Sequence, residues 1–173
     1  MSALRFIRTD TISSTVSTVN IENIFSNNFA VYKMVFTNIT TDTTGQVFSG
    51  RFIDSSDTVQ SESEYYYATR EMKSNAGFAE DRGTNQDNMQ SIIGRQGDSD
   101  KGGATMLHIF NPFDDTEFTN VHSQFVGMSG SDARSFWGGH VYRKEMRMTG
   151  LQIINNNNNF TGGKITTYGY ASV

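Results

Sequence analysis

Three histidines have the widest chemical repertoire in this chain, because imidazole can ligate metals and transfer protons near neutral pH. His108, His122 and His140 fall on three different expected strands. A zinc site would need them to converge, and the chain has no cysteine to complete a ligand set. His108 shares a strand face with Met106 and Phe110, which favours a hydrogen-bonded core histidine. We therefore expect no metal, no cofactor and no catalytic histidine.

Acidic residues could supply calcium ligands or a glycosidase pair of carboxylates. Asp98-Ser-Asp100 and Asp114-Asp115 are close acidic groups, and neither has the spacing of a calcium-binding loop. A glycosidase pair converges only in the folded chain, and nothing singles out two of the 18 acidic residues. Met128-Ser-Gly-Ser-Asp132 lacks the Gly-x-Ser-x-Gly frame of a nucleophile turn. These observations favour a protein that is not an enzyme.

One short stretch contains side chains suited to binding a glycan. Trp137-Gly-Gly-His140 includes the only tryptophan of the chain, and an exposed aromatic ring can stack on a sugar ring. Trp137 and His140 are therefore the candidate glycan contacts. A core or interface position for this tryptophan remains an alternative.

The composition limits the fold class. Gly, Ser, Thr and Asn are abundant, whereas Leu and Ala are scarce, and 13 Phe with 7 Tyr supply aromatic side chains. This balance favours strands and turns over helices. A chain of 173 residues is most simply one domain, 1–173.

The net charge and the hydropathy limit the classes of partner that are expected. The net charge of −4 gives no electrostatic reason to expect nucleic-acid binding. No apolar run has the length of a membrane span. The missing cysteines, and an N-terminus without the apolar block of a secretory signal, fit synthesis in a reducing cytoplasm.

Alternating apolar and polar residues predict about nine or ten short strands, separated by turns. We expect an all-β, single-domain antiparallel β-sandwich of jelly-roll-like architecture, because several connections are too long for hairpins. Period-two spacing predicts which side chains face inward. They are Tyr32, Met34, Phe36, Phe48, Phe52, Leu151, Ile153 and Ile165.

The end of the chain reads as a hairpin. Residues 146–154 and 160–170 are both strand-like, and the run Asn155 to Asn159 lies between them. Asparagine tolerates positive φ and bonds its own backbone, so such a run suits a chain reversal. The C-terminal strand is therefore expected to belong to a sheet.

Over residues 71–103 the alternation weakens, apart from a short strand expected near 89–94. We interpret this segment as a long loop or arm, since small, polar and charged residues dominate it. In the free protein it should be mobile, becoming ordered when a neighbouring subunit buries its few apolar side chains. A disordered surface excursion is the alternative. The candidate subunit-interface residues are Met72, Phe78, Arg82, Met89, Ile92, Ile93 and Arg95.

Three stretches resemble a known family. Val16-Ser-Thr-Val-Asn-Ile-Glu-Asn-Ile-Phe-Ser-Asn-Asn-Phe-Ala-Val-Tyr-Lys33 is similar to the entry segment of small virion structural proteins of tailed bacteriophages, the marine and cyanobacterial type above all. Met148-Thr-Gly-Leu-Gln-Ile153, followed by Phe160-Thr-Gly-Gly-Lys-Ile-Thr-Thr-Tyr-Gly169, resembles their closing hairpin. His108-Ile-Phe-Asn-Pro112 looks like their central strand. Residues 71–103 match no motif of that family.

The resemblance implies a jelly-roll-like subunit of a phage virion, in head decoration or cement, tail or baseplate. Its partners would be other virion proteins and further copies of itself, as a trimer or higher homo-oligomer. No catalytic residues, nucleic acid or membrane come with it, and the protein would be located in the virion after synthesis in the host cytoplasm. The alternative is a carbohydrate-binding or receptor-binding module of a tail fibre, centred on Trp137.

Overall fold

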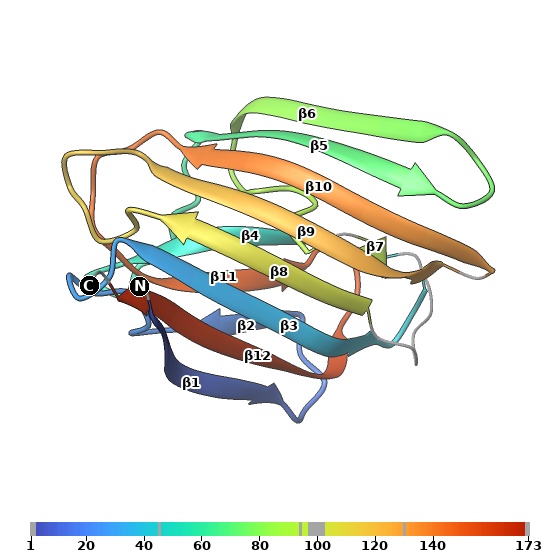
Figure 1. The fold of residues 1–173 in the computed structure, drawn as a ribbon, viewed down its shortest axis with the longest axis horizontal. Coiled ribbons are helices and arrows are strands. Elements are labelled where there is room, and N and C mark those ends of the chain that lie inside the picture. Colours follow the sequence, from blue (N-terminus) through green and yellow to red (C-terminus); the bar gives the residue numbers. More distant parts are fainter. Residues whose placement is uncertain (1–2, 45, 94, 97–102, 130, 172–173) are drawn as a thin grey trace.

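Two antiparallel β-sheets pack face to face in the computed structural model, which describes residues 3–44, 46–93, 95–96, 103–129 and 131–171 (Figure 1). The large sheet has eight strands, in the order β1 (Ala3–Ile12), β12 (Phe160–Ala171), β3 (Val31–Thr41), β8 (Gly103–Phe110), β9 (Thr119–Ser129), β10 (Asp132–Tyr142), β5 (Tyr65–Lys73) and β6 (Phe78–Gln86). The small sheet has four, in the order β2 (Thr18–Ile21), β11 (Met148–Asn155), β4 (Gln46–Asp54) and β7 (Arg95–Gln96).

The predicted all-β sandwich is confirmed. The chain changes sheet at each of its first four connections, from β1 to β5, and again on both sides of β11. This repeated crossing is the jelly-roll-like feature of the topology. No helix occurs among the described residues, so none is present there that is long and apolar enough to cross a membrane.

The core lies between the two sheets. Every side chain predicted to face inward is at most 1% exposed, which confirms the period-two assignment. Gly50 in β4 allows the segment after β6 to pack closely, since a Cβ at this position would lie 3.2 Å from Cδ1 of Ile92. The period-two spacing along β3 and β4 was sufficient to predict which face of each of these strands is buried.

The predicted C-terminal hairpin is wrong. β11 pairs with β2 and β4 in the small sheet, whereas β12 pairs with β1 and β3 in the large one. The asparagine run crosses between the sheets, and Asn159 is held there by its side-chain amide, which donates to Asp42 at 2.8 Å. Phe160 then packs on Phe48 of the opposite sheet, with ring centroids 5.1 Å apart. β11 and β12 each have one apolar face that must be buried. Each strand buries that face between the two sheets from its own sheet, so the two strands do not need to pair with each other.

The expected arm over residues 71–103 is also wrong. β5 continues to Lys73, and β6 pairs back onto it from Met72 opposite Phe78 to Tyr65 opposite Gln86. No side chain of β6 is buried, so this strand lacks the apolar alternation by which strands are recognised.

Apolar residues after β6 belong to the protein's own core. Met89, Ile92 and Ile93 are at most 2% exposed. The backbone of Met89 bridges to Gly50, and the Ile92 amide donates to the Phe48 carbonyl at 3.1 Å. These three residues cannot contact another subunit, because they are already buried in the core of the single chain. Of the strand expected near 89–94, the described residues 89–93 show only this bridge.

The remaining candidate interface residues differ in exposure. Met72 is half-buried, Phe78 and Arg82 are exposed on β6, and Arg95 is in β7 with its side chain outside the described part. Residues 97–102, including Asp98 and Asp100, also lie outside the described residues.

Phe52 is expected to be a main contributor to stability. It is fully buried, and its ring packs on Phe25, Tyr65 and Tyr142. Phe52→Ala should lower the free energy of unfolding by about 3–5 kcal/mol, because it leaves a cavity between the sheets. Phe78→Ala is the matched control, at 65% exposure, and should cost less than about 1 kcal/mol. Denaturant unfolding measures both, and equal losses would contradict this assignment of the core.

Candidate functional site

Trp137 points away from the core, on the outer face of the large sheet. Gly139, two residues further along β10, lies on the same face, and the indole is 50% exposed. Trp137 is paired with Gln124 on β9 and Arg70 on β5. The indole is therefore accessible to a ligand and does not belong to the core, which was the alternative position for this tryptophan.

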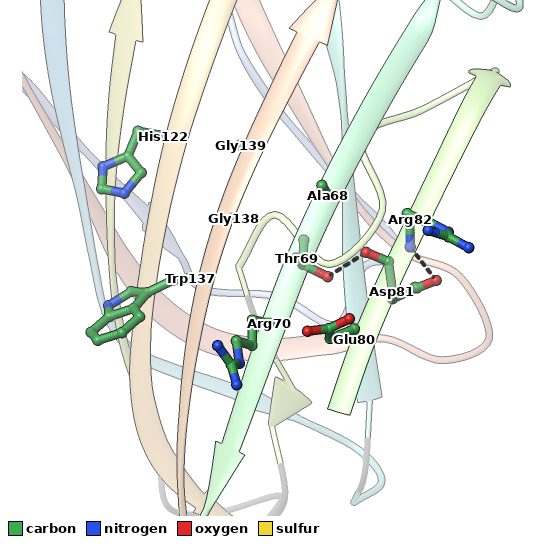
Figure 2. A pocket seen from close by; sticks show the side chains of 10 residues that line it. All are labelled: Ala68, Thr69, Arg70, Glu80, Asp81, Arg82, His122, Trp137, Gly138 and Gly139. Carbon is green, nitrogen blue, oxygen red and sulfur yellow. Dashed lines mark hydrogen bonds between the residues drawn. The ribbon is translucent and has the colours of Figure 1, made fainter. Parts of the chain in front are cut away.

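Two small residues beside Trp137 leave a groove in this face. Gly139 is paired with Ala68, and a Cβ built on Gly139 would meet no atom within 4 Å. The groove has a volume of about 470 Å³. Figure 2 shows its lining, which is Ala68, Thr69, Arg70, Glu80, Asp81, Arg82, His122, Trp137, Gly138 and Gly139.

Strand register places polar groups around the small residues. One row across the sheet runs from His122 through Gly139 and Ala68 to Arg82, so a ring and a guanidinium stand at its two ends. The neighbouring row contains Trp137, Arg70 and Glu80, in that order. The antiparallel ladder therefore fixes an aromatic wall and several charged groups around one open floor.

Charged groups of the groove are available to a ligand. None of the ion pairs between described residues involves Arg70, Glu80 or Arg82. The guanidinium carbon of Arg70 lies 4.0 Å from the ring centroid of Phe78, a cation–π contact that holds the side chain along the sheet. Arg70 also lines the groove, next to Trp137 in the same row.

This arrangement suits a ligand with one apolar face and many hydroxyl groups. The exposed indole provides a flat surface, while guanidinium and carboxylate groups donate and accept hydrogen bonds around it. A pyranose ring has both features. The groove is an open site on a sheet face, which suits binding rather than a water-excluded reaction.

His140 is not part of this site, and its prediction as a glycan contact is wrong. It stands three residues after Trp137, so it points to the opposite face of β10 and is 1% exposed. Nε2 of His140 lies 3.2 Å from Oγ of Ser123, while Nδ1 has no hydrogen-bond partner among the described residues. Burial lowers the pKa of His140 to about 3.

His122 takes the place in the groove that His140 was expected to have. It is exposed, and strand pairing sets it directly opposite Gly139. Nothing in the spacing along β10 pointed to His122, because it comes from the neighbouring strand. Gly139 did carry a signal, since it has the same parity as Trp137 and leaves the adjacent position empty.

His108 is likewise on the outer face, so its expected place in the core is wrong. It is half-buried, and its Nε2 lies 3.1 Å from the Tyr170 hydroxyl. Its ring is nearly parallel to that of His122, with centroids 6.4 Å apart. Desolvation, together with Lys33 and His122, lowers the pKa of His108.

Acidic residues of the described part do not form a metal centre. Asp114 caps its own loop by accepting from the Thr116 hydroxyl at 2.6 Å, which lowers the pKa of this carboxyl. Asp115 pairs with Arg147 at 3.2 Å. Across the described ranges, no group of three or more His, Cys, Asp or Glu side chains could hold a metal ion.

Comparisons with known proteins do not assign the chain to a family. No family model matches it, and no curated protein matches it. Among solved structures, the infectious bursal disease virus VP2 subviral particle aligns over 98% of this chain, at 10% identity and a TM-score of 0.15. The chain spans 41% of that protein. A similarity this low carries no argument about fold or function.

His140 should remain neutral in the folded protein well below neutral pH. The unfolded chain takes up this proton near its usual pKa of 6.5, whereas the folded chain does so only near 3. The free energy of unfolding should therefore fall as pH drops through that window, by up to about 1.4 kcal/mol per pH unit from this residue.

His140→Gln tests this, since glutamine does not titrate and can still bond Ser123. Denaturant unfolding between about pH 7 and pH 4 should show a weaker pH dependence for the variant than for the native chain. An NMR titration of the His140 ring with a midpoint near 6.5 would contradict its buried, neutral state.

Proposed function

We propose that this protein is a non-enzymatic binding subunit, which holds a carbohydrate in the groove beside Trp137. The observation that carries the proposal is the pairing of a half-exposed indole with an unfilled floor at Gly139 and Ala68. An isolated exposed tryptophan would have no defined place for a ligand beside it. Here the ladder puts a space of about 470 Å³ next to the ring.

The charged residues support a saccharide over an apolar ligand. Arg70, Glu80 and Arg82 bring both donors and acceptors to one groove, as a ring of hydroxyl groups requires. The resemblance of the sequence to tailed-phage virion proteins supplies the setting. In that setting the groove would be a receptor-binding site for a host surface glycan.

Trp137 is the only tryptophan of the chain, so its fluorescence reports on the groove alone. We expect bacterial surface polysaccharide or a glycan-array hit to shift this emission in a saturable titration. Trp137→Ala should weaken binding, measured by calorimetry, about 30-fold, which corresponds to about 2 kcal/mol for a central aromatic contact.

Gly139→Leu should block the groove while leaving the fold intact, because the new side chain enters open space. Gly77→Leu is the matched control. A Cβ at Gly77 also meets nothing within 4 Å, and Gly77 does not line the groove. Equal glycan affinity of the native chain and Gly139→Leu would overturn the proposal.

A structural role in a virion is the second candidate function. In favour of it, large apolar side chains remain exposed on the large sheet, namely Leu4, Phe6, Phe78, Phe110, Val126, Met128 and Trp137. Such exposure suits repeated protein–protein contacts. Because Met89, Ile92 and Ile93 are internal, these contacts would use the outer face and edges of that sheet.

Locating the chain in a density map of an intact tailed-phage particle tests this second role. We expect copies related by symmetry, in the head decoration, tail or baseplate, with the outer face or an edge of the large sheet against a neighbour. Absence of the chain from purified particles would refute the virion role. It would leave the glycan measurements unaffected.

A further inference from the structure

Both edges of the large sheet are uncovered. β1 has one buried residue, Ile12, and β6 has none. Figure 1 shows the two strands at opposite ends of the sheet, and no described strand pairs with the outer side of either one. An uncovered edge presents unpaired backbone donors and acceptors, and is therefore a template for another strand.

The direction of the two edge strands allows them to meet. Each of the eight strands is antiparallel to its neighbours, and their even number makes β1 and β6 run in opposite directions. A copy placed beside β6 with its own β1 inward would continue the sheet without breaking the antiparallel order. The ladder would then run from one subunit into the next.

Side chains of the two edges are complementary. On β1 the charge of Arg8 is paired with Asp10 at 2.8 Å, and none of the ion pairs between described residues includes Arg5. On β6 two acidic residues, Glu80 and Asp81, stand against one Arg82. Each edge also exposes a phenylalanine, Phe6 on β1 and Phe78 on β6.

One register satisfies the charge, the apolar contact and the face of each side chain. β-bulges leave regular runs at Ala3–Phe6 in β1 and at residues 78–83 in β6. Setting Arg5 opposite Asp81 joins two side chains on the same face of the sheet. Arg5 is paired with Gly169 and Asp81 with Thr69, and both of these partners are buried on the inner face.

The same register places Phe6 of one copy opposite Glu80 and diagonal to Phe78 of the next. The two rings are 64% and 65% exposed in the single chain. A diagonal pair across an antiparallel ladder is within reach of aromatic side chains. Pairing would therefore bury apolar surface that the isolated chain leaves in water.

We propose that β6 of one copy pairs with β1 of a second copy, head to tail, with Arg5 facing Asp81. The interface joins two different surfaces, so it produces a ring where the rotation closes, or an open chain where it does not. This inference rests on the strand edges and not on the groove floor, although Glu80 and Asp81 of β6 also line the groove.

Cysteine cross-linking tests the register directly, as the native chain has no cysteine. The double variant Arg5→Cys/Asp81→Cys, oxidised mildly, should give covalent trimers and larger species on a non-reducing gel. Each single variant has one thiol and can give nothing beyond a disulfide-linked dimer. A double variant that yields no species larger than a dimer overturns the proposal.

Charge reversal tests the same contact without a covalent bond. Arg5→Glu and Asp81→Lys should each weaken self-association about tenfold, since like charges would face one another, and the double variant should restore it. Sedimentation measures association, with circular dichroism confirming that each variant is folded. A native chain that stays monomeric at all concentrations, or a double variant no better than the single ones, would refute head-to-tail pairing.

Discussion

Tyr65 makes the contact on which the rest of the structure depends. Its ring is fully buried between the sheets and packs against Tyr142, with centroids 4.6 Å apart. Its hydroxyl accepts from the Phe52 amide and donates to the Gln60 carbonyl, both at 2.9 Å. A buried phenol without partners would cost several kcal/mol, so these bonds allow the large sheet to send a polar group into the core. The same burial raises the pKa of Tyr65 far above its usual value. This contact fixes β5 and β10 against β4, and thereby fixes the strands that form the groove.

The unequal size of the sheets then decides what is left exposed. Four strands cannot cover the inner face of eight, and no described element packs on the outer face. On the inner face of β5, the charge of a buried carboxylate is neutralised by an ion pair. Glu71 is 6% exposed and pairs with Arg134 at 2.7 Å. The outer face instead keeps aromatic and aliphatic side chains in water, among them Trp137 and Val126. A protein with this much uncovered sheet is suited to binding by its surfaces.

The fold class and the buried faces could be predicted because period-two spacing follows directly from strand geometry. Strand partners could not, since Leu151 and Ile165 have the same alternation although they belong to different sheets. β6 was missed because an edge strand beyond the small sheet needs no apolar face. In the site, the residue type alone suggested Trp137, whereas His140 stands three residues further along the strand and therefore lies on the opposite face. His122 and Arg82 reach the groove only through cross-strand pairing, which a single sequence does not contain.

NMR on isotope-labelled protein can show whether the outer groove of β10 and β5 binds a saccharide. The single indole N–H of Trp137 and the backbone amide of Gly139 give distinct signals that can be followed as a bacterial glycan is added. We expect these two signals and that of Ala68 to shift together and saturate, while core signals such as that of Leu151 in the small sheet do not move. Shifts confined to loops or to the small sheet, with the indole signal unchanged at saturation, would contradict it.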